Sequence, residues 1–400
     1  MRDVVIVGYG RTAQSRARPK EPERDWFHAL RADELLTAII PEVLARARVA
    51  PESLDDFLVG CALGVTENWT FGGRTPIFQA NLPASIPAKF LDMQCGSGMA
   101  ALHTAFLEIA GGFADTVLAC GMEQMTRVPM GPKLFKEGSI SMNPALSTEE
   151  RYAHWDMDTT MVMGRTAEKL WKQTGFTRRE MDELGVRSHQ LAVRAREQGY
   201  FDGEIIPVDA PQADGSVMTV DRDQAVRDNA TLEGMAGLKT IFDPDHGGIT
   251  AGNASPLNSG AAAMVLTGRE NAEKKGLPVL ASVRSIGFAG VDPTLMGLAP
   301  VPAARRALEA IGLKPSDIDF WEINEAFAVV VLNAVTELGI PMDRANVKGG
   351  GLALGHAMGA TGIRLVGTLA RILHSENGRI GCAASCIGGG QGVATVIERV

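Results

Sequence analysis

Short apolar runs of the strand type alternate along the chain with amphipathic runs of the helix type. In residues 33–48, apolar side chains recur at helical spacing, whereas residues 4–7 form a short continuous apolar run. This alternation predicts an α/β protein whose sheets are covered by helices. We expect a further helix at 99–110 and further strands at 56–59, 116–119, 320–323 and 380–383.

The two ends of the chain repeat one pattern at a constant offset of 264 positions, which carries Pro51 onto Pro315. The same offset carries Ser97-Gly98-Met99 onto Thr361-Gly362-Ile363 and the strand at 116–119 onto the strand at 380–383. Two similar α/β halves are the simplest explanation of this repeat. A site can then form where the two halves meet.

A stretch of different character lies between the halves. It contains a charge-rich run, residues 166–197, that we predict to be helical, and it is typical of an insertion that builds a binding surface. We therefore expect an N-terminal half of residues 1–121 and 246–274, an inserted loop domain of residues 122–245 and a C-terminal half of residues 275–400.

Composition excludes several classes of protein. Of 400 residues, 45% are apolar and 22% are charged, which is typical of a globular protein and not of a disordered, collagen-like or coiled-coil chain. The net charge of −8 argues against nucleic acid as a partner. No apolar run approaches the ~18 residues that span a membrane. Because we find no signal peptide or lipidation motif and an odd number of cysteines, five, we expect a reducing, cytoplasmic location with free thiols.

Cys95 lies just before the helix predicted at 99–110 and is followed by Gly-Ser-Gly. A thiol at a helix N-terminus meets unpaired backbone N–H groups and the positive end of the helix dipole, and both lower its pKa. This position indicates a nucleophile, although a buried structural cysteine is the alternative.

His356 lies among glycines, in the segment 349–362, before a second helix. A neutral imidazole accepts a thiol proton near pH 7, so His356 is a candidate base for a cysteine. A loop histidine without a role is the alternative.

Cys386 opens the sequence Cys-Ile-Gly-Gly-Gly-Gln-Gly after a predicted strand. Glycines at this place expose backbone N–H groups that can bind a developing oxyanion, although a small buried residue is the alternative. A zinc site at Cys382 and Cys386 is disfavoured because no second pair of ligands with suitable spacing is present, so we expect no metal.

Asn324-Glu325-Ala326-Phe327 follows the strand predicted at 320–323. Proteins of the α/β class place polar side chains from such strand ends into a site. An ordinary helix N-cap at Asn324 is the alternative.

The segment from Gly8 to Ala13 fits the dinucleotide pattern G-x-G-x-x-A. That fingerprint requires a helix directly after it and an acidic residue at the end of a second strand. Residues 16–25 are instead basic and contain proline, and the next acids, Asp33 and Glu34, lie in a predicted helix. A nucleotide-dependent dehydrogenase is therefore disfavoured.

Taken together, these segments resemble the thiolase family. The Cys95 segment resembles the family's acyl-accepting cysteine motif, and the blocks at Asn324–Phe327, Gly355-His356 and Cys386–Gly390 resemble three further family motifs. Residues 250–255, Thr-Ala-Gly-Asn-Ala-Ser, resemble the substrate loop. Five such motifs in order, over nearly the whole chain, are highly specific.

The resemblance implies two βαβαβαββ halves stacked as five α-β-α-β-α layers, with a loop domain that binds coenzyme A and makes oligomer contacts. It implies coenzyme A thioesters as substrates, no metal or redox cofactor, and a homodimer or homotetramer. By the same resemblance, Cys95 attacks the substrate carbonyl, His356 takes its proton and Cys386 moves the Cα proton. Asn324 holds a water that, with the His356 ring N–H, stabilises the enolate, while the N–H groups of Cys95 and Gly388 form a second oxyanion hole.

Further positions resemble the substrate channel of the family. Arg227 resembles the residue near the adenine–phosphate end of coenzyme A. The positions that resemble the pantetheine and acyl channel, or stand in the adjoining motifs, are Met163, Ala254, Ser255, Met296 and Phe327.

The chain departs from the family pattern at several positions. Asp92, Ala357 and Lys348 stand where Asn, Pro and Asn are usual, and Val162-Met163 replaces the His-Met pair of short-chain biosynthetic members. The last difference favours a degradative 3-ketoacyl-CoA thiolase (acetyl-CoA C-acyltransferase) of fatty acid β-oxidation. An acetoacetyl-CoA-forming acetyl-CoA C-acetyltransferase and a thiolase for an unusual acyl group remain alternatives.

Two rival functions are weaker. A ketosynthase or hydroxymethylglutaryl-CoA-type synthase generally lacks the second cysteine that Cys386 represents, and a non-catalytic acyl-CoA-binding subunit would not need an intact catalytic set. A partner hydratase/dehydrogenase subunit is compatible with the sequence.

Overall fold

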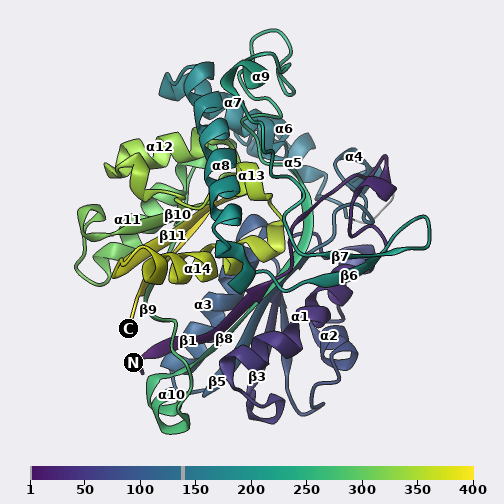
Figure 1. Cartoon of the computed structure of the whole chain (residues 1–400). Coiled ribbons are helices and arrows are strands. Elements are labelled where there is room, and N and C mark those ends of the chain that lie inside the picture. Colours follow the sequence, from purple (N-terminus) through teal and green to yellow (C-terminus); the bar gives the residue numbers. More distant parts are fainter. Residues whose placement is uncertain (1, 137–139) are drawn as a thin grey trace.

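The computed structural model describes residues 2–136 and 140–400 (Figure 1). These residues form two α/β halves, and a largely helical extension stands above them in the view of Figure 1. The first and last strands lie near each other, so both chain ends are found on the same side of the molecule.

The sheet of the N-terminal half has the strand order β4-β3-β5-β8-β1. β3 is parallel to β4 and β5, whereas β8 is antiparallel to β5 and β1. Its strands are β1 (Val4–Arg11), β3 (Asp56–Gly60), β4 (Ala88–Leu91), β5 (Thr116–Glu123) and β8 (Asn258–Gly268), and the short β2 (Ser15–Arg16) pairs with β8.

The sheet of the C-terminal half repeats this arrangement in the order β10-β11-β12-β9. Residues Val4–Ile6 of β1 pair with Ala281–Val283 of β9, which joins the two sheets edge to edge. The strands of the C-terminal sheet are β9 (Ala281–Gly290), β10 (Phe320–Ile323), β11 (Ile380–Ile387) and β12 (Gln391–Glu398).

The repeat expected from the sequence is confirmed by these bounds. β3 and β10 begin 264 positions apart, and β5 and β11 are separated by that offset at both ends. The predicted strands at 4–7, 116–119 and 380–383 are correct but shorter than the observed ones.

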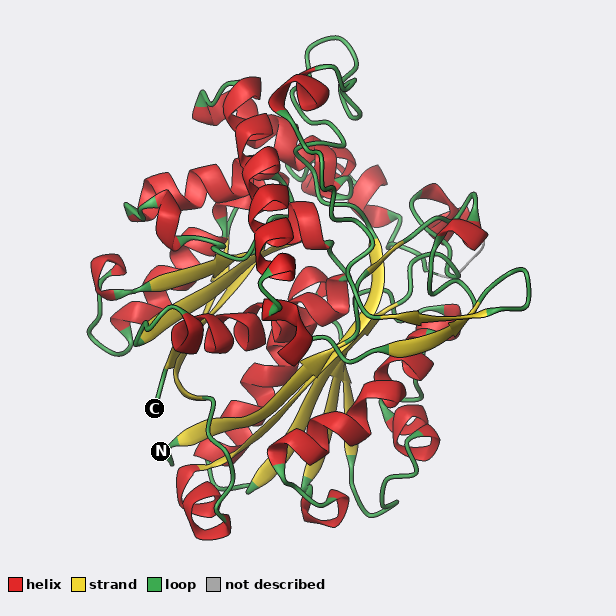
Figure 2. Cartoon of the chain, viewed as in Figure 1, coloured by secondary structure: helices red, strands yellow, loops and turns green. Residues whose placement is uncertain are grey.

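Helices separate and cover the two sheets, which gives the expected five layers among the described residues (Figure 2). α3 (Ser97–Ala110) and α14 (Met358–Ser375) form the middle layer, because they share one apolar core with strands of both sheets. α1 (Ala32–Ala47) covers the outer face of the first sheet. α11 (Pro300–Glu309) and α12 (Ala328–Leu338) cover that of the second sheet.

Glycines allow the two middle helices to cross with their backbones in contact. A Cβ on Gly98 of α3 would collide with the backbone oxygen of Gly359, and a Cβ on Gly362 of α14 would collide with the backbone nitrogen of Met99. Gly98 and Gly362 are related by the internal repeat. The crossing fixes the N-termini of α3 and α14 against each other, and both candidate catalytic segments lie there.

The dinucleotide-like glycines have a packing role. Gly8 and Gly10 lie inside β1, and β1 leads into β2 and not into a helix. A Cβ on Gly8 would lie 2.6 Å from the Cβ of Ala47, and one on Gly10 would lie 2.5 Å from Ile206 Cδ1. The pattern therefore lets α1 and the insertion approach the strand closely.

The connection between β5 and β8 occupies residues 124–257. Gly175, with φ 72°, ends one helix, and the capping box of Thr177 with Glu180 begins the next, so the helical run predicted at 166–197 is two helices. The helices and strands of the connection between β5 and β8 are α4 (Pro132–Lys136), α5 (Ala145–Thr148), α6 (Met157–Thr160), α7 (Met163–Thr174), α8 (Arg178–Glu197), α9 (Leu232–Ala236), β6 (Val208–Pro211) and β7 (Val217–Val220).

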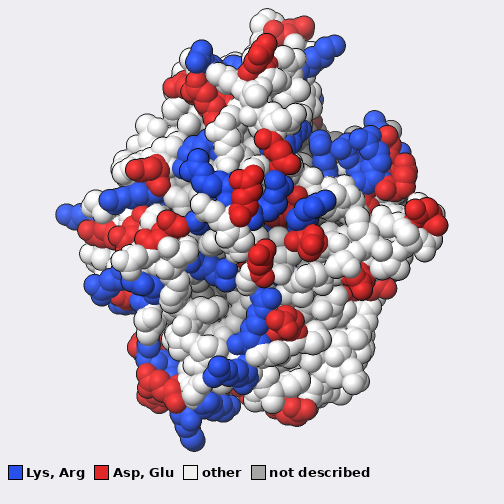
Figure 3. All heavy atoms as spheres, viewed as in Figure 1, with Lys and Arg blue, Asp and Glu red and all other residues white. Residues whose placement is uncertain are grey.

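The remaining helices are α2 (Arg74–Gln79), α10 (Arg269–Lys275) and α13 (Gly351–Leu354). None of the described helices combines the length and apolarity needed to cross a membrane. Acidic and basic side chains are intermixed over the face in Figure 3.

Candidate active site

One cavity of about 810 Å³ is lined by residues of both halves and of the insertion. It brings together ten of the eleven candidate site residues. These are Cys95, Met163, Arg227, Ala254, Ser255, Met296, Phe327, His356, Cys386 and Gly388. The eleventh, Asn324, lies behind His356 and contacts its ring.

Cys95 lies in the single 3-10 turn, Gln94–Gly96, that leads into α3. Gln94 has a φ of 48°, which is costly for a residue other than glycine. Its backbone N–H donates to Asp92 Oδ1 at 2.9 Å, and its carbonyl accepts from Ser97 Oγ at 2.6 Å. These bonds hold the strained turn, which presents the thiol to the cavity.

The pKa of Cys95 is raised to about 11, so the expectation of a lowered pKa was wrong. Burial raises it most, the backbone N–H of Gly388 lowers it, and the Glu123 carboxylate raises it again. Desolvation therefore outweighs the helix N-terminus, and the thiol needs a base to become a nucleophile.

The His356 ring is held in one tautomer. Nδ1 lies 2.7 Å from Thr361 Oγ1, and that hydroxyl lies 2.8 Å from the Ala357 carbonyl, which can only accept. Because the hydroxyl has one proton and gives it to Ala357, Nδ1–H donates to Thr361 and Nε2 keeps a free lone pair. Burial, and then Arg364, lower the pKa of His356 to about 3, so the ring is neutral near pH 7.

The backbone on either side of His356 is fixed as well. Gly355 has a φ of 109°, and the His356 N–H donates to Asn258 Oδ1 at 3.1 Å. Asn258 is the first residue of β8, so the sheet of the N-terminal half positions a base that belongs to the C-terminal half.

Asn324 follows β10 directly and is not a helix N-cap, because α12 begins at Ala328 with Phe327 as its N-cap. Its Nδ2 lies 3.5 Å from His356 Nε2. Its Oδ1 is buried without a hydrogen-bond partner among the described residues. A buried carbonyl oxygen of this kind is suited to accept from a bound water.

Cys386 lies at the end of β11, beside the turn into β12. Gly389 and Gly390 have φ values of 80° and 76°, which favour glycine in this turn, and the Gly388 N–H just before them contacts the Cys95 thiol. Burial, and then the neighbouring Cys95, raise the pKa of Cys386. The two thiols therefore share one pocket and influence each other's charge.

The candidate substrate loop is joined to the Asn324–Phe327 block. The Ser255 N–H donates to the Ala326 carbonyl at 2.9 Å, and Ala254 forms a β-bridge with Phe327. These contacts hold Ala254 and Ser255 on the cavity wall.

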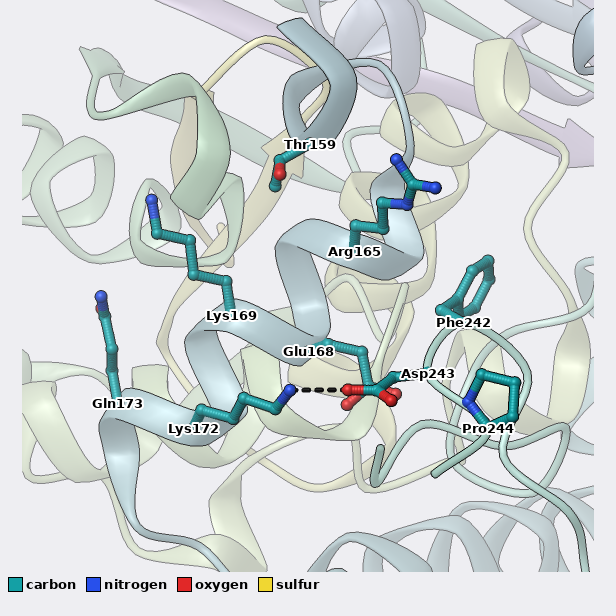
Figure 4. Close-up of a pocket in the computed structure, with 9 residues that line it drawn as sticks. All are labelled: Thr159, Arg165, Glu168, Lys169, Lys172, Gln173, Phe242, Asp243 and Pro244. Atoms are coloured by element: carbon teal, nitrogen blue, oxygen red, sulfur yellow. Dashed lines mark hydrogen bonds and ion pairs between the residues drawn. The ribbon is translucent and has the colours of Figure 1, made fainter. Parts of the chain in front are cut away.

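Helix α7 anchors the start of this loop. Glu168 accepts from the N–H groups of Gly248 and Ile249, each at 2.9 Å, and Lys172 pairs with Asp243 at 2.7 Å (Figure 4). Phe242 lines both the surface pocket drawn in Figure 4 and the main cavity, and thus forms part of the wall between them.

The sequence reasoning did not identify several residues of the site. Thr361 was visible only as a partner in the repeat, and its contact with His356 depends on the first turn of α14. The cavity wall also contains Met161 and Met358, which lie beside family-like motifs, and Arg16, Met130 and His189, which come from segments without such a motif. Among the described residues, no group of three or more His, Cys, Asp or Glu side chains is arranged to hold a metal ion.

Comparison with known proteins agrees with this geometry. The family model "Thiolase, N-terminal domain" matches residues 4–270, and "Thiolase, C-terminal domain" matches residues 277–399. A 3-ketoacyl-CoA thiolase of Marinobacter nauticus is 39% identical over all of this chain and 99% of its own length.

Solved structures are similar over the same extent. The acetyl-CoA acetyltransferase of Bacillus anthracis matches with a TM-score of 0.88 at 35% identity, and human mitochondrial 3-ketoacyl-CoA thiolase matches with 0.87 at 29% identity. Each match covers 100% of this chain and 99% of the solved one. Fold and matches together define an acyltransferase of the α/β class. The chain belongs to the thiolase family.

Proposed function

We propose that the protein is a 3-ketoacyl-CoA thiolase, which converts a 3-ketoacyl-CoA and coenzyme A reversibly into a shortened acyl-CoA and acetyl-CoA. The observation that carries the proposal is the convergence of Cys95, His356 and Cys386 in one cavity. Thiolysis needs one nucleophile, a base for it, and a separate acid for carbon.

In the first half-reaction, Cys95 Sγ attacks the 3-keto carbonyl while His356 Nε2 takes the thiol proton. The N–H groups of Cys95 and Gly388 stabilise the resulting oxyanion. The C2–C3 bond then breaks, and its electron pair forms the enolate of acetyl-CoA. The protonated His356 and a water on Asn324 Oδ1 stabilise this enolate, and Cys386 donates its proton to C2.

In the second half-reaction, the Cys386 thiolate takes the proton of the coenzyme A thiol. The coenzyme A sulfur attacks the acyl group on Cys95, and the Cys95 sulfur leaves and recovers its proton from His356. Both cysteines and the histidine return to their neutral forms. Such a resting state agrees with the raised pKa values of both thiols and the lowered pKa of the imidazole.

The cavity wall supports acyl groups larger than acetyl. It contains Met130, Met161, Met163, Met296 and Met358, and methionine adapts its shape to different apolar partners. The protein thus acts on medium-chain 3-ketoacyl-CoA, as in fatty acid β-oxidation. It works in the cytoplasm as a homodimer or homotetramer, alone or with a hydratase/dehydrogenase subunit, and uses coenzyme A as substrate without a metal or redox cofactor.

An acetyl-CoA C-acetyltransferase is the second candidate, because the similar Bacillus anthracis structure bears that name. The two activities are separated by thiolysis assays with acetoacetyl-CoA and 3-ketohexanoyl-CoA under identical conditions. We expect acetyl-CoA from both, with kcat/KM for the six-carbon substrate at least equal to that for acetoacetyl-CoA. Turnover of acetoacetyl-CoA alone would favour the second candidate, and no turnover of either would contradict both.

A further inference from the structure

Glu325 is a buried carboxylate of the Asn324–Phe327 block, and the proposed reaction gives it no role. The residue is 0% exposed. Its carboxylate accepts hydrogen bonds from Ser188 Oγ at 2.6 Å, Asn346 Nδ2 at 2.8 Å and the Leu352 N–H at 3.0 Å. All three donors are neutral groups. Because it is unfavourable to move a carboxylate out of water without well-made hydrogen bonds, the donors indicate what this group holds in place.

The three donors come from separate segments of the chain. Ser188 lies in α8 of the insertion, whereas Asn346 precedes α13 and Leu352 is part of it. α13 packs against α8 (Figure 1). Because the Ser188 hydroxyl gives its one proton to Glu325, it accepts from the Gly350 N–H at 3.0 Å. Glu325 and Ser188 together therefore fix the short helix α13 of the C-terminal half to the insertion.

Glycines let α13 lie directly on the block that carries Asn324. A Cβ on Gly350 would lie 2.3 Å from Glu325 Cδ, and a Cβ on Gly351 would lie 3.4 Å from Asn324 Oδ1. After α13 the chain passes through one glycine and reaches His356. Glu325 is thus next to Asn324 in the chain and is hydrogen-bonded to the helix that leads to His356.

We propose that Glu325 is a positioning residue that fixes Asn324 and His356 relative to each other. Ser188, from the insertion, holds the Glu325 carboxylate in place. The inference rests on the proposed function, in which a water on Asn324 and the His356 ring stabilise the same enolate oxygen. Two groups that address one atom depend on their separation, and a displacement of ~1 Å can cost ~10²-fold in rate.

Acyl transfer to Cys95 should depend much less on Glu325. Proton transfer from the thiol uses the His356 ring without Asn324, and Thr361 holds that ring through a separate contact. A defect in position should therefore slow carbon–carbon bond cleavage, which passes through the enolate, more than exchange of the acetyl group between acetyl-CoA and a second thiol.

A comparison of these two reactions tests the role of Glu325. Thiolysis of acetoacetyl-CoA and acetyl exchange are measured under identical conditions for Glu325→Gln, Ser188→Ala and Ser188→Thr. Glu325→Gln keeps the shape of the side chain but turns an amide donor toward a group that now donates to the carboxylate, whereas Ser188→Thr keeps the hydroxyl.

Ser285→Ala is the matched control. It also removes a buried hydroxyl, which donates to the Ala307 carbonyl at 2.6 Å, and Ser285 does not line the cavity. Thermal unfolding of each variant checks the fold.

Glu325→Gln should lower kcat for thiolysis about 10²-fold and the exchange rate less than about 10-fold. Ser188→Ala should lower the ratio of thiolysis to exchange about 10-fold, as expected for one hydrogen bond to a charged group. Ser188→Thr should restore most of this ratio, and Ser285→Ala should leave it unchanged.

A ratio of thiolysis to exchange that keeps its unmodified value in folded Glu325→Gln and Ser188→Ala protein would overturn the positioning role. This outcome leaves the proposed function intact. If the unmodified protein catalysed neither reaction, the proposed function itself would fail.

Discussion

The Nδ1 atom of His356 lies 2.7 Å from the hydroxyl oxygen of Thr361, and this contact sets the chemistry of the ring. The hydroxyl gives its own proton to the Ala357 carbonyl, so it can only accept from the imidazole. As a result, the free lone pair of His356 is on Nε2, the nitrogen that faces Asn324. Thr361 is thus a positioning residue that acts through His356.

Replacing Thr361 with Val should lower kcat for thiolysis about 10- to 100-fold, part of the ~10²–10⁴ that general base catalysis contributes. The ring loses the acceptor that keeps the proton on Nδ1. Thr361→Ser should restore most of the rate. The rate of Cys95 alkylation by iodoacetamide across pH separates this role from a structural one, because only loss of the base shifts that profile. An unchanged pH profile of Cys95 alkylation in folded Thr361→Val protein would contradict the positioning role of Thr361.

Cys386→Ala should stop carbon–carbon bond cleavage but slow acyl transfer to Cys95 much less. The variant has no proton donor for C2, so we expect a loss of at least about 10²-fold in thiolysis of acetoacetyl-CoA. Exchange of the acyl group between acetyl-CoA and a second thiol should be slowed much less, because water can replace Cys386 as the proton partner of a thiolate sulfur but not of the C2 carbon. Cys382→Ala, which removes another buried thiol of the same strand four residues away, is the control. Full thiolysis in Cys386→Ala would refute the role of Cys386.

His103 should make the protein less stable in acid. The ring contacts Thr395 Oγ1 at 2.8 Å, and burial lowers the pKa of His103 from 6.5 to about 3. Between these values the unfolded chain binds the extra proton, so stability falls as pH drops below 6.5. Denaturant unfolding at pH 7 and pH 5 measures the effect. Between pH 7 and pH 5, the free energy of unfolding of His103→Gln should fall by about 2 kcal/mol less than that of the unmodified protein. Equal decreases would contradict the assignment of this acid sensitivity to His103.

Gly362→Ala should destabilise the protein and reduce its activity together. The added Cβ meets the backbone of Met99 where α3 and α14 cross, and overpacking of this kind costs ~1–3 kcal/mol. The helix ends that carry Cys95 and His356 then move apart. Gly290→Ala, where a Cβ meets nothing within 4 Å, is the control for thermal unfolding and kcat. An unchanged unfolding temperature would show that the crossing is not tight.

The local pattern of apolar and polar residues was sufficient to predict the strands and helices that position the site. The offset that relates Pro51 to Pro315 also fixes the ends of β5 and β11, because a duplicated half keeps the same apolar periodicity. The break at Gly175 was missed because a charged helical pattern continues on both sides of it.

Other properties depend on tertiary structure and could not be predicted from one segment. The pKa of Cys95 follows from its burial beneath the second half, which no local motif records. The wall formed by Arg16, His189 and Arg227 combines three distant segments. Asp223 and Gln224, which hold two of them together, show no pattern of their own in the sequence.

Mass spectrometry of the protein after incubation with acetyl-CoA tests the central claim most directly. The unmodified protein and Cys386→Ala should each gain one acetyl group, located by peptide mapping on Cys95, and addition of coenzyme A should remove it. Cys95→Ala should gain none. An unacetylated Cys95, or an acetyl group that forms equally well in Cys95→Ala, would contradict the proposed acyl-cysteine chemistry.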